Sequence, residues 1–219
     1  MIGSCGIDWS ATGSMFSGIA AWVGVGAVVW AAKQGRDAVG DWRAQKVIER
    51  QLDTGERVLT AAYRAKSALE SIRANLMTGG EMARAEEDLA RDNPFAGQPD
   101  RERRAKFVQS FYNRVNATKE DWDEVFAVIP LCVAYFGDDV AEALRSLIHQ
   151  RNSVTVAADE YLDDFDGRDR EFTKSLRKEM FRGKAGDDPV AGKVNEAIAK
   201  LEAKLLPLLR NDTRSLRAK

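Results

Sequence analysis

The sequence predicts an all-α protein in which one N-terminal transmembrane helix is followed by a long helix and a multi-helix cytoplasmic bundle. Three observations lead to this prediction. Side-chain charge is almost absent from the first 32 residues, where only Asp8 is charged, and is dense after them. Beyond that point no run alternates apolar and polar residues as a half-buried strand does. Apolar residues recur instead at spacings of three and four, the period of an amphipathic helix.

Charge and cysteine usage limit the classes of partner. The chain has 219 residues, of which 33 are Lys or Arg and 34 are Asp or Glu, so its formal net charge is −1. A balanced surface lacks the long-range positive field on which non-specific nucleic-acid binding depends, and we expect no nucleic-acid partner. Cys5 and Cys132 lie in unlike contexts, so we expect no disulfide framework.

The first element is an uncharged stretch of 24 residues, 9–32, which follows a short leader at 1–8. A transmembrane helix needs about 20 predominantly apolar residues, and this stretch is long enough. Trp9 and Trp30 lie near its two ends, where aromatic rings prefer the headgroup layer. A cleaved signal peptide is disfavoured because no Lys or Arg precedes the stretch, and a buried core helix is disfavoured by its uncharged length.

The flanking charges predict an orientation for this helix. No Lys or Arg precedes it and several follow, so the positive-inside rule places the N-terminus outside and the rest of the chain in the cytoplasm. The predicted partner of the flanks is the lipid bilayer, and the membrane-flanking residues are Trp9, Trp30, Lys33, Arg36, Arg43 and Lys46. Small residues recur four apart within the stretch, which permits a homo-oligomer through close helix packing at Ser10, Ser14 and Gly18.

A long helix is predicted in the region 33–80, after the span. Its range is about Asp37 to Met77, and Gly79 with Gly80 is expected to end it. Its apolar stripe consists of Ile48, Leu52, Leu59, Ala62, Leu69, Ile72 and Leu76. The stripe is expected to pack on its own domain, because a continued heptad places residues unsuited to a coiled-coil seam at Gly55, Lys66 and Arg73.

The helical domain is predicted at 81–209, ahead of a loose basic tail at 210–219. Periodicity and breaking signals divide it into helices at 81–92, 101–116, 119–136, 138–164, 168–181 and 189–209. Thr118 with Asp121 resembles a capping box, and Asp138 and Asp188 are expected to cap later helices. The apolar run from Val125 to Phe136 is only 12 residues long, too short to cross a bilayer, and is predicted to form the core.

Few residues carry signals of catalysis or metal binding. His149 is the only histidine, and the three residues between Arg145 and His149 are one fewer than ribonucleases of the HEPN type use. The acidic cluster from Asp163 to Asp169 fails the EF-hand pattern at its first and twelfth positions. No phosphate loop, nucleophile elbow or zinc-protease motif occurs. We therefore predict no catalytic, cofactor-binding or metal-binding residue and no cofactor, which favours a protein that is not an enzyme.

One resemblance adds to this interpretation. The apolar stretch leads into Trp42-Arg43-Ala44-Gln45-Lys46, and a long helix with Glu49, Arg50 and Tyr63-Arg64-Ala65 follows. This join resembles a loose group of uncharacterised single-pass membrane proteins in bacterial and prophage genomes. The resemblance covers about the first third of the chain, implies a bacterial inner membrane, and implies no known activity.

Three functions stay open. The favoured one is a single-pass membrane-anchored helical scaffold or interaction protein that binds an unknown protein partner. The second is a phage-related or anti-phage defence effector at the membrane. The third is a membrane-anchored helical enzyme, such as a HEPN-like ribonuclease that uses Arg145 and His149. The partner, the oligomeric state, any ligand and the start codon, Met1 or Met15, are not decided by the sequence.

Overall fold

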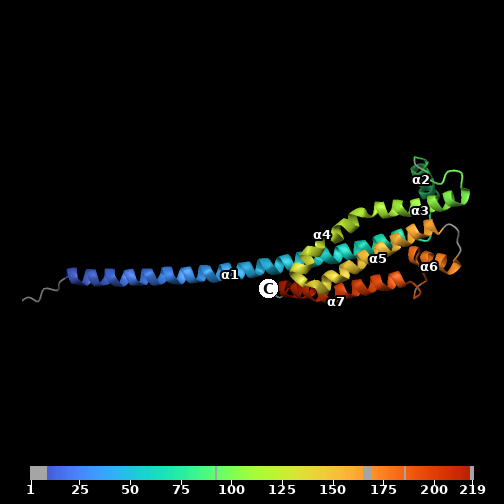
Figure 1. The fold of residues 1–219 in the computed structure, drawn as a ribbon. Coiled ribbons are helices and arrows are strands. Elements are labelled where there is room, and N and C mark those ends of the chain that lie inside the picture. Colours follow the sequence, from blue (N-terminus) through green and yellow to red (C-terminus); the bar gives the residue numbers. More distant parts are fainter. Residues whose placement is uncertain (1–8, 92, 165–168, 185, 218–219) are drawn as a thin grey trace, which may run out of the picture. The chain divides into compact units, whose positions relative to one another are not determined.

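Helices make up all the regular secondary structure that the computed structural model describes, at residues 9–91, 93–164, 169–184 and 186–217 (Figure 1). Side chains are described from Trp42 to Arg210 apart from those gaps, and at a few earlier positions. The predicted all-α class is confirmed. The chain divides into two compact units, residues 1–50 and 51–219.

The first unit contains the N-terminal part of α1 (Trp9–Ile72), where the sequence predicts a transmembrane helix. Most side chains of that predicted span, with the small residues proposed for self-association, lie outside the described residues. Those that are described in this unit are all exposed, and they include the charged Lys33 and Lys46. Across the part of the chain that the structure describes, no helix combines the length and the apolar character that crossing a bilayer requires. On this finding the predicted single-pass localisation in the bacterial inner membrane, with the N-terminus outside, is wrong.

The second unit begins within α1, which ends at Ile72, earlier than the sequence predicts. Gly79 and Gly80 do not end this helix but open α2 (Gly79–Ala90). The cause is a capping box at Thr78, whose hydroxyl accepts from the Glu81 N–H at 3.3 Å, while the Glu81 carboxylate accepts from the Thr78 N–H at 2.7 Å. Two free backbone donors at the start of α2 are satisfied in this way.

Thr118 alone separates α3 (Pro99–Ala117) from α4 (Lys119–Phe136). The predicted capping box at this residue is wrong, because the Thr118 hydroxyl donates backwards, to the carbonyls of Arg114 at 3.2 Å and Val115 at 3.0 Å. Its backbone, at φ −101° and ψ 11°, is not extended as a capping residue usually is. Thr118 therefore closes α3 and does not cap α4.

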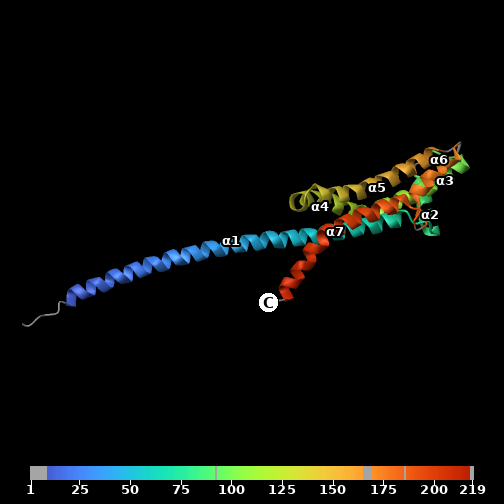
Figure 2. The same ribbon diagram turned by 90° about the horizontal axis from the view of Figure 1, so that it is seen from below.

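Gly137 ends α4 and precedes α5 (Asp138–Asp163). Its φ of 85° lies in the left-handed region, where glycine meets no steric penalty. Asp138 is consequently the first residue of α5, and the prediction that it caps this helix is wrong. α5 packs against α4, α6 (Arg170–Met180) and α7 (Pro189–Arg217), and Figure 1 shows α7 on the side of the bundle away from α4, while Figure 2 gives the same helices seen from below.

The last helix, α7 (Pro189–Arg217), begins where the sequence predicts and runs beyond the predicted end, through most of the region expected to be a loose tail. Asp188 caps it as predicted, since its carboxylate accepts from the Ala191 N–H at 3.0 Å. Pro189 takes the first helical position, where its missing N–H costs nothing.

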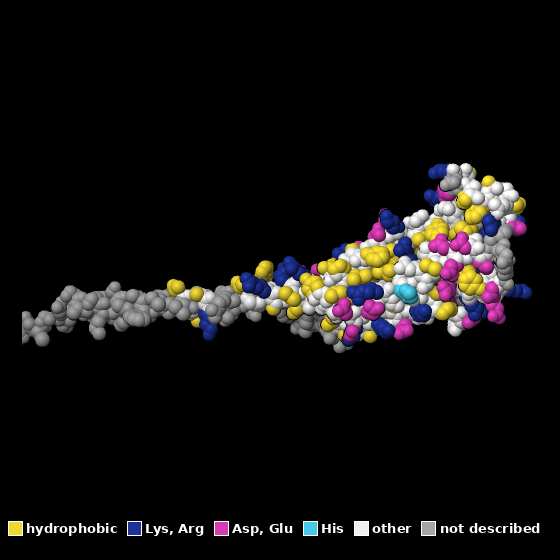
Figure 3. All heavy atoms as spheres, in the orientation of Figure 1, with side chains coloured by type: hydrophobic (Ala, Val, Ile, Leu, Met, Phe, Trp, Pro, Cys, Tyr) yellow, Lys and Arg dark blue, Asp and Glu magenta, His cyan; other side chains and the backbone are white. Residues whose placement is uncertain are grey.

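A single cluster of buried apolar side chains joins the end of α1 to α3, α4, α5, α6 and α7. Its largest fully buried members are Trp122, Phe111, Ile72, Leu144, Leu147, Met180, Leu201 and Leu205. The apolar run of α4 contributes Val125, Val128 and Cys132, as predicted, whereas Phe126 and Val133 on the same helix are exposed. Apolar side chains reach the surface in the region of α4 and α5 in Figure 3.

Candidate functional site

The second unit contains an open cleft of about 850 Å³ between the segment after α1, helix α3, helix α6 and the segment that follows α6. Six of the eleven residues that line it are cationic, namely Arg104, Arg170, Lys174, Arg177, Lys178 and Arg182. None of the described residues that line it is acidic. We call these residues, with Asn75, Phe107, Thr173, Phe181 and Gly183, the basic cleft.

Helix α6 supplies four of the six cations because of its residue spacing. Arg170, Lys174 and Arg177 lie four and three residues apart, so they share one face of the helix. The neighbouring face carries Leu176 and Met180, which are buried in the core. The helix is fixed at its start by Asp169, whose carboxylate accepts from the Glu171 and Phe172 N–H groups at 2.9 and 3.1 Å. Burial of one face therefore turns the cationic face toward the cleft and the solvent.

Two phenylalanine rings form an apolar part of the cleft wall. Phe107 of α3 and Phe181 after α6 lie with ring centroids 5.4 Å apart, in a tilted pair. Phe107 also makes an edge contact with Tyr161 of α5, at 6.0 Å. These contacts hold the Phe107 ring between the core and the cleft, so the cleft offers both positive charge and aromatic surface.

The cations of the cleft differ in the hydrogen bonds and ion pairs that they make within the chain. Arg104 donates to the backbone carbonyls of Tyr161, at 3.1 Å, and Asp164 at the end of α5, and its guanidinium lies 4.8 Å from the Tyr161 ring centroid. Arg182 and Lys178 make exposed ion pairs at 3.3 and 3.7 Å, with acidic residues outside the cleft lining.

The remaining three cations, Arg170, Lys174 and Arg177, have no ion pair with an acidic side chain among the residues that the structure describes. Arg177 lies 6.0 Å from the Phe181 ring centroid, at the limit of a cation–π contact. Like charges at these spacings repel each other on a helix, and no acidic residue in the described lining offsets the repulsion. The face is therefore suited to an anion supplied from outside the chain.

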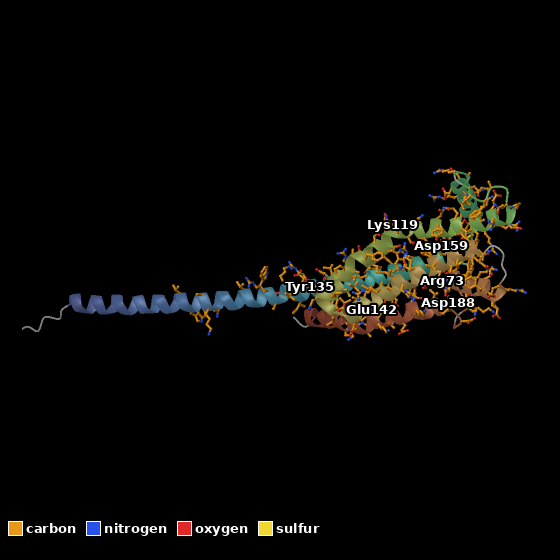
Figure 4. The ribbon with its side chains drawn as sticks, in the orientation of Figure 1. Arg73, Lys119, Tyr135, Glu142, Asp159 and Asp188 are labelled. Atoms are coloured by element: carbon orange, nitrogen blue, oxygen red, sulfur yellow. The ribbon has the colours of Figure 1, made fainter. Side chains whose placement is uncertain are left out.

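A buried ion pair between Arg73 and Asp188 lies at the end of α6, the helix that supplies most of the cleft's cations. Arg73, which follows α1, has only 3% of its side chain exposed, and Asp188 has 7%. Arg73 Nη1 donates to Asp188 Oδ2 at 3.0 Å, and Nη2 lies 2.9 Å from Oδ1. Figure 4 shows the two side chains meeting where the end of α1 reaches α6 and α7.

The same guanidinium closes the end of α6. Arg73 donates to three carbonyls at the C-terminus of this helix, those of Lys178 at 3.1 Å, Glu179 at 2.8 Å and Phe181 at 2.5 Å. These carbonyls have no partner within the helix, and a cation also complements the negative end of the helix dipole. Burial alone raises the pKa of the Asp188 carboxyl, but hydrogen bonds from Arg73, Ala191 and Gly183 outweigh burial and lower this pKa.

The residues that the sequence predicts as membrane flanks belong to the first unit, not to the cleft. Trp30 has 64% of its surface exposed, and Lys33, Arg43 and Lys46 are exposed as well. Lys46 makes an ion pair with Glu49 at 2.6 Å. The side chains of the other two predicted flanks, Trp9 and Arg36, lie outside the described residues.

Arg145 and His149, considered as a nuclease pair, both lie exposed on α5, where the histidine is visible in Figure 3. Arg145 makes ion pairs with Glu142 at 3.2 Å and Asp138 at 3.7 Å. Cys132 is fully buried, and burial raises the pKa of its thiol to about 11, so it is held as an unreactive thiol. None of these three residues lines the cleft.

Neither a metal site nor a related protein helps to assign a function to the described residues. Among the described residues no group of three or more His, Cys, Asp or Glu side chains is placed to hold a metal ion. Two members of the acidic cluster, Asp166 and Gly167, lie outside the described residues. Comparison with known protein families, with curated proteins and with solved structures found no match.

Sequence reasoning missed the cleft because its cations come from separate parts of the chain. Arg104 belongs to α3, and Arg182 follows α6, and no local motif connects them. One signal was present: in the segment from Arg170 to Met180 the cations recur at helical spacing while Leu176 and Met180 share another face. This spacing predicts a short helix with its cations gathered on one face.

Proposed function

We propose that the chain is a helical interaction protein whose second unit binds an anionic partner in the basic cleft. The observation that supports this proposal most directly is the convergence of six cations in a cleft whose described lining has no acidic residue. Cations that served only solubility would be interspersed with acids, as they are over the rest of this neutral chain. Here they gather in one concave site.

The arrangement suits binding better than catalysis. A general acid or base needs a group that titrates near the working pH, and Arg and Lys remain protonated unless they are strongly perturbed. The cleft lining has no His, Cys, Asp or Glu among its described residues, and its hydroxyl, Thr173, donates to the Asp164 carboxylate. The lining therefore supplies charge and hydrogen-bond donors but no nucleophile activated by a base.

The cleft is held ready for a partner by the buried Arg73–Asp188 pair, which ties the end of α6 to the start of α7. Because α6 is anchored at both ends, its cationic face does not need to be ordered when a partner arrives. A preformed site loses less conformational entropy on binding. The exposed charges also attract an anionic partner over a distance, so association should weaken as salt rises.

The test is a comparison of partners retained by three forms of the full chain. One is the wild type, one is Lys174→Glu/Arg177→Glu, and the matched control is Lys193→Glu/Lys204→Glu on α7. The control makes the same change of charge at exposed residues that do not line the cleft. Each tagged form is expressed in its natural host, and bound molecules are identified by mass spectrometry.

We expect a stoichiometric partner with the wild type and the control that is lost from the cleft variant. Salt should release the same partner, with an affinity that falls as ionic strength rises through 0.15 M. Retention of every partner by the cleft variant at wild-type levels would show that the cleft is not the binding site, and the proposal would be abandoned.

A further inference from the structure

The chemistry of the cleft points to a narrower class of ligand. We propose that the anion it binds is a phosphate carried on an aromatic ring, presented as a phosphorylated tyrosine in a segment of a partner protein. This inference rests on the proposed function, because it names the group that the basic cleft recognises. It is carried by the density and type of the cations and by the rings beside them.

The number of cations favours phosphate over carboxylate. A phosphate monoester carries a charge of about −1.5 to −2 at neutral pH and three strong acceptor oxygens, whereas a carboxylate carries −1 and two oxygens. Two of the three cleft cations that have no ion pair among the described residues, Arg170 and Arg177, are arginines, whose planar guanidinium groups bind phosphate through two parallel hydrogen bonds. A single carboxylate leaves most of these donors without a partner.

The position of the cations sets the size of the ligand. Arg170 and Arg177 are separated by about 10 Å along α6, at a rise of about 1.5 Å per residue. A phosphate near Lys174, between them, is within reach of both arginine side chains. The cleft volume of about 850 Å³ then leaves room for the group that carries the phosphate and for neighbouring residues of a peptide.

The rings beside the cations favour an aromatic carrier. Phe107 and Phe181 line the same cleft as the cations, and their centroids are 5.4 Å apart. A third ring placed against this pair gains aromatic contact as well as burial of apolar surface. Serine and threonine phosphates present only an aliphatic stem, which makes little use of these rings.

The first experiment separates the two components of the ligand. Binding of phenyl phosphate, inorganic phosphate, benzoate and acetate to the full chain is measured by NMR titration or calorimetry at low salt. We expect phenyl phosphate to bind about tenfold tighter than benzoate, because of the added charge and oxygens. We expect it to bind about fivefold tighter than inorganic phosphate, because of the ring.

Variants then assign each component to its residues. Phe107→Leu keeps an apolar side chain of similar size, so it should reduce phenyl phosphate binding to the level of inorganic phosphate and leave inorganic phosphate unchanged. Lys174→Glu/Arg177→Glu should abolish binding of both phosphates, and Lys193→Glu/Lys204→Glu should affect neither. If circular dichroism shows that Phe107→Leu does not fold, Phe181→Leu replaces it, since this ring lines the same cleft.

The source of the phosphate is decided by a last comparison. A neutral Gly/Ser peptide with one phosphotyrosine is compared with the same peptide carrying phosphoserine or glutamate, and with adenosine monophosphate. The phosphotyrosine peptide should bind tightest. Tighter binding of the nucleotide, or equal binding of the glutamate peptide, would overturn the inference.

Failure of the inference can be distinguished from failure of the proposed function. If no phosphate probe binds but Lys174→Glu/Arg177→Glu still loses the partner retained by the control, the cleft binds another anion and only the inference fails. If the partner is also retained by the cleft variant, the proposed function fails as well.

Discussion

Two groups of arginines in the second unit differ in what they bind. Arg73 is buried, and its guanidinium donates to three backbone carbonyls and to the carboxylate of Asp188. Arg170 and Arg177 of α6 are exposed, and they line a cleft whose described lining has no acidic residue. The same side chain thus holds the fold together in one place and is available to a partner in the other. The difference lies in burial and in which acceptors the fold brings to it.

The largest effect is expected from breaking the buried group. Arg73→Met leaves the buried carboxylate of Asp188 without its cation, with only the Gly183 and Ala191 N–H groups as donors, and leaves the last carbonyls of α6 without the guanidinium. Removal of one partner from a buried ion pair typically costs about 3–5 kcal/mol, and we expect a loss of that size in the free energy of unfolding measured with urea. Arg177→Met is the matched control from the exposed group and should change stability by less than about 0.5 kcal/mol.

A double-mutant cycle sharpens this prediction. The double variant Arg73→Met/Asp188→Asn should lose less free energy of unfolding than the two single variants lose together. Each single variant leaves one buried charge without its partner, whereas the double variant removes both charges. A loss below about 1 kcal/mol for Arg73→Met would show that water replaces the guanidinium and that the pair is not structural.

The sequence contained Arg73 as an anomaly but could not give its role. Continuing the heptad places Arg73, with Gly55 and Lys66, where an apolar residue belongs, and this disfavoured a strict coiled-coil seam. The carbonyls that Arg73 binds come from residues more than 100 positions later in the chain. Helical periodicity is a local property, so the all-α class could be predicted, whereas the acceptors of Arg73 are brought to it only by the tertiary fold, in which α6 packs against α5.

The two Thr residues that precede helices show the same limit. Thr78 and Thr118 are each followed three residues later by an acidic residue, Glu81 and Asp121. Only Thr78 forms a capping box, because Thr118 directly follows α3 and its hydroxyl is drawn to the carbonyls of that helix. The local signals were similar, although Asp121 is a poorer match to a capping box than Glu81, and the helix that ends at Thr118 removed the possibility of a cap there.

A second, smaller effect is expected at Glu81, which joins the capping box to Arg114. Arg114 Nε lies 2.7 Å from the Glu81 carboxylate, and Arg114 also donates to the Ala74 carbonyl at 2.8 Å. Hydrogen bonds from Arg114 and Thr78 lower the pKa of Glu81 from 4.5 to about 2. A carboxyl whose pKa is lowered by folding contributes stability above its unfolded pKa and loses it as the pH falls through the folded value.

Glu81→Gln keeps a side chain that can complete the capping box but removes the charge. We expect it to lower the free energy of unfolding by about 1–2 kcal/mol at pH 7. The difference from wild type should stay constant down to about pH 5, shrink between pH 4.5 and 2, and vanish near pH 2, as followed by urea unfolding at each pH. A difference independent of pH would mean that the hydrogen-bond geometry, not the charge of Glu81, is what matters.

A gain in stability is expected at Gly55, the other anomaly of the heptad analysis. A Cβ built there meets Phe136 Cζ at 3.5 Å and Leu205 and Leu209 at 3.9 and 3.8 Å, all ordinary van der Waals contacts. Glycine inside a helix costs about 0.5–1 kcal/mol relative to alanine, so Gly55→Ala should raise the free energy of unfolding by that amount. Gly183→Ala is the contrasting case, because its Cβ meets the Asp187 carbonyl oxygen at 2.9 Å, and it should destabilise.

The smallest effect on stability, and the sharpest test of the comparison, is expected from Lys174→Glu/Arg177→Glu. Since neither cation has an acidic partner in the described part of the chain, reversal of both charges breaks no ion pair there. The new acids reduce the repulsion among the remaining cations of the cleft, and this gain offsets the less favourable placement of an acid in the last turn of α6 and of a second acid three residues after Glu171. The free energy of unfolding should therefore stay within about 0.5 kcal/mol of wild type or rise slightly, measured by urea unfolding at low salt. A loss of 2 kcal/mol or more would place these two cations with Arg73 as structural residues, and the cleft would then have no set of cations reserved for a partner.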